Sequence, residues 1–314
     1  MRIAFVGKGG SGKTTLASLF SQYAAKNNSR VLALDADINQ HLAPALGYTG
    51  ELKSMGEDID TIKEYLRGDN PLFTLSGMHK TTPPGSGSQF VTLDEADWFM
   101  DRYTAEVDGM YVAGAGAIPP GNIGVRCYHG LNGAIELLLG HMIDRAEDTV
   151  VVDMTAGADA FSSSLFAKVD ALVLVVEPTV KSLSVYDQFL PNAKKYGVPL
   201  LVVGNKIIDE EDRKFVEQRV GALVACVGSS PFVRARERGA MIDFGEIEPG
   251  LEQQLASVFA TAQSLERDWA AFEQRNHLFH QKNADAWAGA DARMQIDHTF
   301  SLKQYADGYL GSTS

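Results

Sequence analysis

The chain has 314 residues, of which 45% are hydrophobic and 22% charged, and its formal net charge at pH 7 is -12. This length allows one large α/β domain or two small ones, and the acidic balance disfavours nucleic acid as a partner, because non-specific binding needs a basic face to replace phosphate counterions. Two cysteines form no disulfide framework and no apolar run approaches the roughly 18 to 20 residues that span a bilayer, so we predict a cytoplasmic protein without a membrane span.

Short apolar runs rich in valine, isoleucine and leucine recur along the chain. Because their hydrophobicity is continuous rather than alternating, they predict strands that are covered on both faces, as in a parallel sheet. Helix-like segments separate most of them, for example residues 14–27 and 130–145. We therefore expect an α/β fold with a doubly wound, mostly parallel sheet that binds ligands at the carboxyl ends of its strands. The predicted strands are residues 2–7, 30–35, 110–116, 149–153, 171–177, 199–206 and 222–228.

The first predicted strand runs into the phosphate-binding pattern G-x-x-x-x-G-K-[ST] at residues 7–14, and a helix follows. This strand, loop and helix context separates a true phosphate loop from a chance match. Glycines let backbone N–H groups point at phosphates, and the helix N-terminus adds a partial positive charge. Lys13 is predicted to reach the β- and γ-phosphates, Thr14 to coordinate Mg²⁺ and Thr15 to contact the α-phosphate. The other predicted cradle residues are Gly7, Gly9, Gly10, Ser11 and Gly12.

A second lysine, Lys8, directly follows the first glycine of the loop. The string KGGSGKTT resembles the deviant phosphate loop of the MinD/ParA superfamily of P-loop ATPases. In that family the extra lysine crosses to the nucleotide of a second subunit and acts as an arginine finger does, by neutralising charge on the transferred phosphoryl group. The resemblance implies a nucleotide-dependent homodimer with Lys8 and Lys13 in catalysis. The alternative is that Lys8 serves only its own phosphates or the solvent.

Further motifs extend the resemblance over roughly residues 1–250. The string LDADINQH contains Asp35 and Asp37. By similarity, Asp37 orients or deprotonates the attacking water, and Asp35 supports the hydration shell of Mg²⁺. In VVVDMTAG, Asp153 is the implied water-mediated partner of Mg²⁺, and Gly157 resembles the glycine that senses the γ-phosphate.

Two later segments resemble the base pocket of the family. In VVGNKI, Asn205 is implied to hydrogen-bond adenine, and in GSSPF the backbone near Pro231 is implied to close the pocket. A guanine reader has the pattern N-K-x-D, whereas the aspartate here arrives one residue late, at Asp209. We therefore expect ATP rather than GTP.

Within the family, the chain looks most like the CooC-type accessory ATPases of carbon monoxide dehydrogenase. That branch places C-x-C before a helix so that two subunits share a metal, and this chain has Cys127 and His129 there. Such a pair suits Zn²⁺ or Ni²⁺ at a dimer axis, although a lone cysteine and a nearby histidine are more often packing or hydrogen-bonding residues. Where the metal-inserting branch commonly has DTEAG, this chain has DMTAG.

The sequence thus predicts an ATP-binding, slowly hydrolysing switch that acts on an unidentified protein or metal-centre client. Two other functions remain open. One is an ATP-dependent adaptor or positioning protein without a transition metal, and the other, less favoured, is a small-molecule kinase, which would have no need of Lys8.

Two regions look added to a P-loop ATPase domain at residues 1–250. The first is an insertion at about residues 50–108, whose stretch KTTPPGSGSQ (80–89) predicts a mobile surface loop, either solvated or acting as a lid or partner site. The second is a C-terminal extension at residues 251–314. Its apolar residues from Leu251 to Phe272 recur in steps of four and three and predict one amphipathic helix, docked on its own domain or on a partner. The tail after Arg275 has no clear period.

Overall fold

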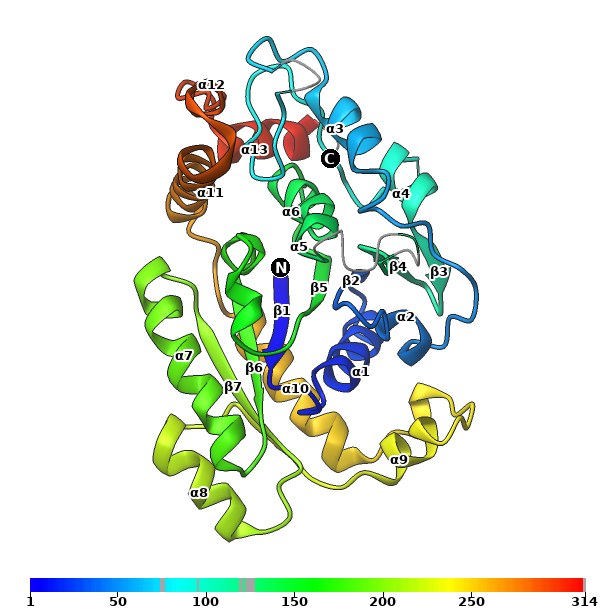
Figure 1. Cartoon of the computed structure of the whole chain (residues 1–314). Coiled ribbons are helices and arrows are strands. Elements are labelled where there is room, and N and C mark those ends of the chain that lie inside the picture. The colour runs from blue at the N-terminus through cyan, green and yellow to red at the C-terminus, as the bar shows by residue number, and fades with distance from the viewer. Residues whose placement is uncertain (74–76, 95, 119–120, 122–127, 313–314) are drawn as a thin grey trace.

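A computed structural model describes residues 1–73, 77–94, 96–118, 121 and 128–312. Its centre is an eight-stranded sheet in the order β3-β4-β2-β5-β1-β6-β7-β8, in which neighbouring strands are parallel except for the antiparallel pair β3 and β4 (Figure 1). The predicted doubly wound sheet and all seven predicted strands are confirmed. The strands are β1 (Arg2–Gly7), β2 (Arg30–Ala36), β3 (Ala105–Val107), β4 (Met110–Gly114), β5 (Asp148–Met154), β6 (Ala171–Val176), β7 (Leu200–Asn205) and β8 (Ala225–Val227).

Strand β3 is the one strand of this sheet that the sequence did not predict. It is three residues long and only partly buried, so it lacks the apolar run that marks the other strands. A two-residue turn at Asp108 and Gly109 joins it to β4, with φ values of 50° and 72°. Asp-Gly with positive φ at both positions is the preferred chemistry of a tight hairpin. The dipeptide was therefore a usable signal for this edge strand.

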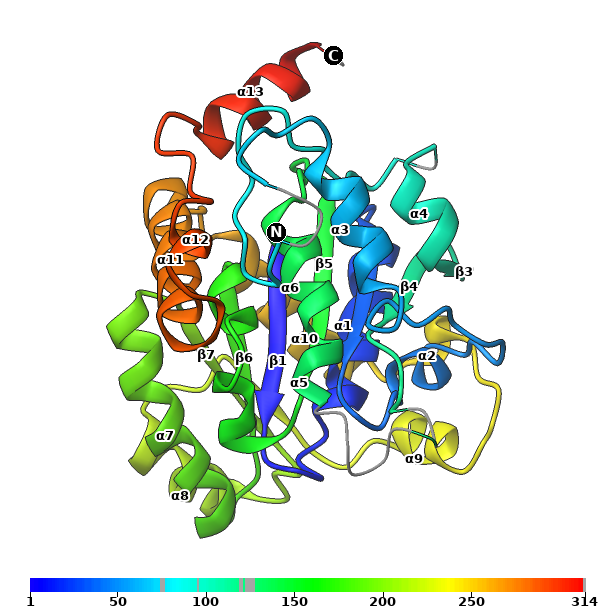
Figure 2. The same ribbon diagram turned by 45° about the horizontal axis from the view of Figure 1, so that its top comes forward.

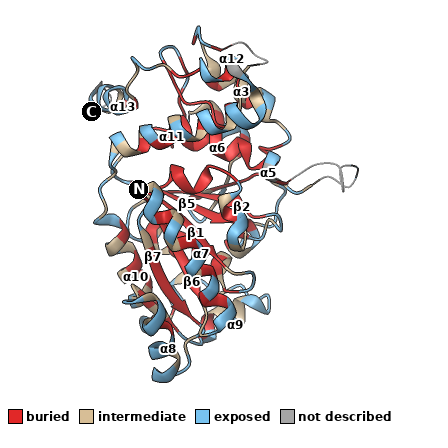
Figure 3. Cartoon of the chain, turned by 60° about the vertical axis from the view of Figure 1, so that its left-hand side comes forward, coloured by how far each residue is buried: buried red, intermediate tan, exposed pale blue. Residues whose placement is uncertain are grey.

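Helices cover both faces of the sheet, because successive strand residues point to opposite sides. Ile3 and Phe5 of β1 pack with α1 and α10, whereas Ala4 and Val6 pack in the other core with α6 and α7. Figure 3 shows the central strands buried between these layers. The first face carries α1 (Lys13–Lys26), α2 (Leu42–Ala45), α9 (Pro231–Glu237) and α10 (Pro249–Gln263), and the second carries α3 (Ile59–Arg67), α4 (Trp98–Tyr103), α6 (Gly133–Gly140), α7 (Val180–Tyr196) and α8 (Glu210–Val220).

The helix predicted at residues 130–145 is shorter in the structure. A turn of helix, α5 (Tyr128–Leu131), precedes α6, which ends at Gly140. The following backbone pairs with Val91 instead of continuing the helix: Val91 N donates to His141 O and Ile143 N donates to Val91 O, each at 2.9 Å. The helix thus ends at Gly140, and the backbone that follows pairs with a residue about 50 positions earlier in the chain.

The single helix predicted from Leu251 to Phe272 is wrong, because two helices share that stretch. Helix α10 ends at Gln263, and α11 (Trp269–Asn283) starts after Asp268, whose carboxylate accepts a hydrogen bond from Ala271 N at 2.9 Å. Between them Arg267 forms ion pairs with Asp144 and Asp170, both at 2.7 Å. The apolar face of α10 packs in the core beside α1.

The prediction of a mobile surface loop at residues 80–89 is also wrong. Thr81 and Thr82 are 2% and 1% exposed. The hydroxyl of Thr82 donates to Gln295 Oε1 at 3.0 Å, and the hydroxyl of Thr81 lies 3.2 Å from His280 Nδ1. The loop lies under the C-terminal helices, where α12 (Ala290–Arg293) and α13 (Leu302–Ser312) follow the π-helical turn η5 (Ala284–Ala288) (Figure 2). Across the described ranges, no helix has the length and apolar character to cross a membrane.

Candidate functional site

The loop between β1 and α1 has the backbone that its glycines allow. Gly7, Gly10 and Gly12 have φ values of 151°, 82° and 94°. A side chain at Gly7 would place Cβ 2.5 Å from Val175 O, and one at Gly12 would place it 2.2 Å from Asn205 Nδ2. Left-handed φ values favour glycine, the contact with the backbone of Val175 excludes a larger residue at Gly7, and a larger residue at Gly12 would displace the Asn205 amide.

Two residues at the end of β7 hold the phosphate loop through hydrogen bonds to its carbonyl oxygens. Asn205 Nδ2 donates to Ser11 O at 2.7 Å, and Lys206 Nζ donates to Gly10 O at 2.8 Å. Lys206 also pairs with Glu177 at 2.6 Å, and its own φ is 60°, a left-handed value that strains a non-glycine residue. The predicted residue Asn205 therefore contacts the loop directly, and its neighbour Lys206 was missed although it stands in the same N-K dipeptide.

Three aspartates and a threonine meet where neighbouring strands end. The register of the sheet pairs Asp153 of β5 with Asp35 of β2. Thr14 Oγ1 donates to Asp153 Oδ2 at 2.5 Å, and Asp35 accepts hydrogen bonds from Asp37 N (3.0 Å) and Leu42 N (2.8 Å). The structure thus brings together the four predicted residues Thr14, Asp35, Asp37 and Asp153.

Burial and mutual repulsion disturb the ionisation of two of these carboxyl groups. Burial, aided by the charge of Asp153, raises the pKa of Asp35 to about 8. Burial also raises the pKa of Asp153 to about 7, against the opposing effects of Thr14 and Lys13. Asp153 Oδ1 is buried without a hydrogen-bond partner in the described part of the chain. An orphaned carboxylate oxygen beside a threonine hydroxyl fits a hard divalent cation, which prefers oxygen ligands.

Replacing Asp153 by asparagine is expected to stabilise the ligand-free protein at pH 8 by roughly 1 to 3 kcal/mol and to change little at pH 4. A carboxyl group whose pKa is raised on folding binds more protons in the folded state, so its contribution to stability falls as the pH rises from about 4 to the folded pKa. Asparagine cannot ionise, so the variant does not lose stability in this way as the pH rises. Urea unfolding of both proteins at the two pH values measures the difference. Asp101→Asn, on the surface of α4, is the matched control, and equal stability at pH 8 would contradict the prediction.

A cavity of about 590 Å³ lies beside the loop, and we call it the phosphate-loop cavity. Its far wall is formed by the turn between β8 and α9, which belongs to the predicted segment GSSPF, and by three residues of α9 that the sequence did not indicate, Val233, Arg234 and Glu237. The predicted residues that line it are Gly9, Gly10, Gly12, Lys13, Thr14, Thr15, Asp37 and Asn205.

Other predicted residues lie around this cavity rather than in its lining. Pro231 starts α9 and lines a neighbouring cavity of about 320 Å³ that includes Cys226. Gly157 has a φ of 67° and begins the short helix η2 (Gly157–Phe161). Lys8 donates to Gly9 O at 3.1 Å and its Nζ lies 3.8 Å from Glu177. Its side chain is 37% exposed, so it is available for contacts outside its own loop.

The predicted transition-metal ligands cannot be placed. Cys127 lies outside the described residues, and so does the side chain of His129. Within the described ranges, no group of three or more histidine, cysteine, aspartate or glutamate side chains is arranged to ligate a metal directly, and this includes Asp35, Asp37 and Asp153. The Cys127 and His129 site stays a prediction from the sequence.

This fold and this site define a P-loop nucleotide-binding protein. Residues 3–275 match the family model of the CobQ/CobB/MinD/ParA nucleotide binding domain, so the chain belongs to that family. The identification of a MinD/ParA-type ATPase that resembles CooC is therefore confirmed.

Relatives and solved structures agree with this assignment. The carbon monoxide dehydrogenase accessory protein CooC of Rhodospirillum rubrum is 28% identical, over 74% of this chain and 84% of its own length. An uncharacterized ATP-binding protein of Methanocaldococcus jannaschii is 30% identical, over 67% and 77%. MinD of Pyrococcus horikoshii, solved with Mg-ADP, superposes with a TM-score of 0.55 at 17% identity, over 84% of this chain and 96% of MinD, which supports the fold.

Proposed function

We propose that this protein binds Mg²⁺-ATP in the phosphate-loop cavity and hydrolyses it slowly, as a switch that acts on a client. The observation that carries the proposal is the meeting of Thr14, Asp37 and Asp153 beside a complete phosphate loop. Lys13 is 6% exposed and lines the same cavity, so its charge is available to the β- and γ-phosphates. A bound ATP would thus meet the cation site and the candidate base Asp37 together.

The contacts of Asn205 support ATP as the nucleotide. Its Nδ2 is committed to Ser11 O, which leaves the side-chain oxygen as the group that can face a base. An oxygen acceptor suits the amino group of adenine and not the carbonyl oxygen of guanine. The turn before α9 would close the pocket near Pro231, in which Ser230 already lines the cavity.

The residues present fit Mg²⁺. Thr14 would ligate it, and Asp35 and Asp153 would hold it partly through water. When bound, the ion neutralises charge that develops on the phosphates. Asp153 and Asp35 would then be ionised, since a cation opposes the burial and repulsion that raise their pKa values.

A homodimer with Lys8 acting across its interface is part of the proposal. Support comes from the exposed side chain of Lys8 and from three exposed apolar residues in the segments that directly follow β2, β6 and β7, one of which, Val180, is the first residue of α7. Ile38, Val180 and Ile208 are 45%, 74% and 86% exposed. All three residues follow the carboxyl ends of their strands, at the edge of the sheet where the nucleotide would sit, so a facing copy would cover them.

Adding Lys8→Ala is expected to abolish ATP-dependent dimerisation of an Asp37→Asn protein that holds ATP without cleaving it. The reason is that the interface would lose a cation that meets phosphate charge from the other subunit. Light scattering in Mg²⁺-ATP and in ADP gives the mass of each form. Lys214→Ala, on the exposed surface of α8, is the matched control. A protein that stays monomeric in ATP, or that dimerises regardless of nucleotide and Lys8, would favour the small-molecule kinase, whose mark is a phosphorylated acceptor.

The likeness to the CooC accessory protein is the ground on which we propose a client, which is a protein or a metal centre. The same likeness is the ground for proposing Ni²⁺ or Zn²⁺ at a dimer axis. The alternative function is that of an ATP-dependent adaptor or positioning protein that binds no transition metal. The division into an ATPase domain at residues 1–250 and an extension at 251–314 is likewise a proposal, and the family match runs across that boundary to residue 275. The insertion at 50–108 and the extension are the surfaces we propose for a client.

A further inference from the structure

The residue that stands out beside the candidate catalytic aspartate is Gln40, which the sequence did not indicate. Its φ is 50°, and four non-glycine residues in the described part of the chain have a positive φ. A left-handed backbone costs a non-glycine residue on the order of 1 to 3 kcal/mol and persists only where the surroundings enforce it. The side-chain contacts of Gln40 must therefore stabilise this strained backbone, which lies three residues after Asp37.

The side-chain amide of Gln40 joins three parts of the fold. Its Nε2 donates to Asp37 O at 2.6 Å and to the hydroxyl of Tyr128 at 3.2 Å, and it lies 3.3 Å from Asp35 Oδ1. Its Oε1 accepts from Gly116 N at 3.1 Å. Both ends of the amide therefore have partners, so the side chain has one preferred orientation.

The end of β4 is shaped to admit this side chain. A Cβ on Gly114 would lie 2.5 Å from Gln40 Oε1, closer than any tolerated contact. The glycine thus makes the room in which the amide lies. On the other side Tyr128 is 6% exposed, so the packing of α5 fixes the position of its hydroxyl.

A second amide acts on the neighbouring peptide group. Asn132, next to the start of α6, donates from Nδ2 to Ala36 O at 3.1 Å. The carbonyl groups of Ala36 and Asp37, one on each side of the Asp37 Cα, are therefore both held by side-chain amides. The backbone that carries the Asp37 carboxylate is therefore anchored by the segment after the neighbouring strand β4, by α5 and by Asn132 between α5 and α6.

We propose that Gln40 is a positioning residue for ATP hydrolysis, with Tyr128 as the group that holds its amide in place. The inference rests on the proposed function, because it assigns Gln40 a role through Asp37. Gln40 does not line the phosphate-loop cavity and need not touch nucleotide. Its effect is to hold the peptide group of Asp37, and so to fix where the carboxylate meets the attacking water. A displacement of that carboxylate lowers the rate of the chemical step with little effect on binding.

The test compares Gln40→Met, Tyr128→Phe and the double variant with the wild-type chain in single-turnover hydrolysis and in nucleotide affinity. Gln40→Met keeps the length of the side chain and removes the amide. We expect its rate to fall about 10-fold, with affinity for Mg²⁺-ATP within about 2-fold of wild type. Tyr128→Phe is expected to lose about 3-fold, and the double variant to be no slower than Gln40→Met, because the two residues act through one contact.

The matched control is Tyr103→Phe, which removes a hydroxyl that donates to Asp58 at 2.7 Å, outside the phosphate-loop cavity. Its rate is expected to match the wild type. Two results would overturn the inference while leaving the proposed function intact: a wild-type rate in Gln40→Met, or a joint loss of rate and affinity that marks Gln40 as part of the binding site. Two independent, multiplying losses in the double variant would remove Tyr128 from the proposal. A wild-type chain that fails to hydrolyse ATP would instead contradict both the proposed function and the role of Gln40.

Discussion

Asp37→Asn is expected to bind Mg²⁺-ATP nearly as tightly as the wild-type chain and to hydrolyse it at least about 100-fold more slowly, the scale at which general acid–base groups contribute. Asparagine has the shape of aspartate, so the hydrogen bonds that Asp37 Oδ1 accepts from Asn39 N (3.0 Å) and Asn39 Nδ2 (2.8 Å) can be kept at one oxygen. The change removes the negative charge and the second acceptor oxygen. The attacking water then loses the group that orients or deprotonates it.

Single-turnover hydrolysis and nucleotide affinity separate the two effects. Asp60→Asn is the matched control, because Asp60 is 92% exposed on α3 and its replacement should change neither quantity. If Asp37→Asn hydrolyses ATP within a few fold of wild type, then Asp37 is not the base and the water must be oriented by another group. If it loses affinity and rate in parallel, Asp37 acts in binding.

The parts of the fold and site that could be predicted from the sequence are those that residues adjacent in the chain determine by themselves. The phosphate loop is a contiguous string whose glycines follow directly from its backbone, as Gly7 and Gly12 show. Buried parallel strands are apolar on both faces and need no partner to be recognised. Asp35, Asp37 and Asp153 could be found because each ends such a strand, and parallel strands end at the same edge.

The parts that could not be predicted depend on contacts between distant residues. Gln40 and Tyr128 are 88 positions apart, and Lys206 reaches a loop carbonyl 196 positions away. Residues 80–89 have a loop-like composition, yet residues 81–85 are buried because the C-terminal helices cover them. The break between α10 and α11 follows the same rule, because the partners of Arg267 are Asp144 and Asp170.

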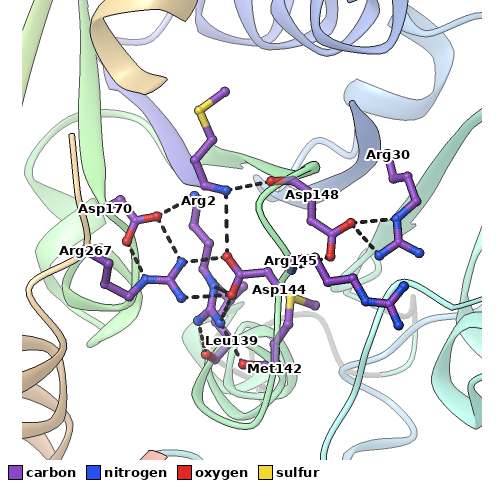
Figure 4. Close-up of polar contacts among 10 residues, drawn as sticks. Arg2, Arg30, Leu139, Met142, Asp144, Arg145, Asp148, Asp170 and Arg267 are labelled. Atoms are coloured by element: carbon purple, nitrogen blue, oxygen red, sulfur yellow. Dashed lines mark hydrogen bonds and ion pairs between the residues drawn. The ribbon is translucent and has the colours of Figure 1, made fainter. Parts of the chain in front are cut away.

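Those partners belong to a buried ion-pair cluster at the opposite end of the sheet from the phosphate loop (Figure 4). Asp144 accepts from Arg2 Nη2 at 2.5 Å and from Arg267 at 2.7 and 2.9 Å. Arg2 also donates to the carbonyl oxygens of Leu139 and Met142. The cluster therefore joins the start of β1, the segment after α6 and the link between α10 and α11. It holds the C-terminal helices on the sheet.

Asp144→Asn is expected to lower the free energy of unfolding by about 3 to 5 kcal/mol, the range observed when one partner of a buried ion pair is removed. Arg2 has no exposed surface, and Asp144 is the nearest carboxylate to its guanidinium. Without that charge, Arg2 and Arg267 stay buried with one carboxylate, Asp170, between them. Urea unfolding at pH 7 measures the loss. Asp187→Asn is the matched control, because it breaks an exposed pair with Arg219 and should cost less than about 1 kcal/mol.

The pH dependence of this loss tests whether charge is its cause. Burial alone would raise the pKa of Asp144, but the charges of Arg2 and Arg267 hold that pKa well below its usual range. A carboxyl group whose pKa is lowered on folding stabilises the protein fully above its unfolded pKa of about 4, and this contribution is lost as the pH falls toward the folded pKa. The advantage of wild type over Asp144→Asn should therefore be constant from pH 5 to 7 and shrink below pH 4. An advantage that stays the same down to pH 3 would mean that the packing and hydrogen bonds of Asp144, rather than its charge, hold the C-terminal helices in place.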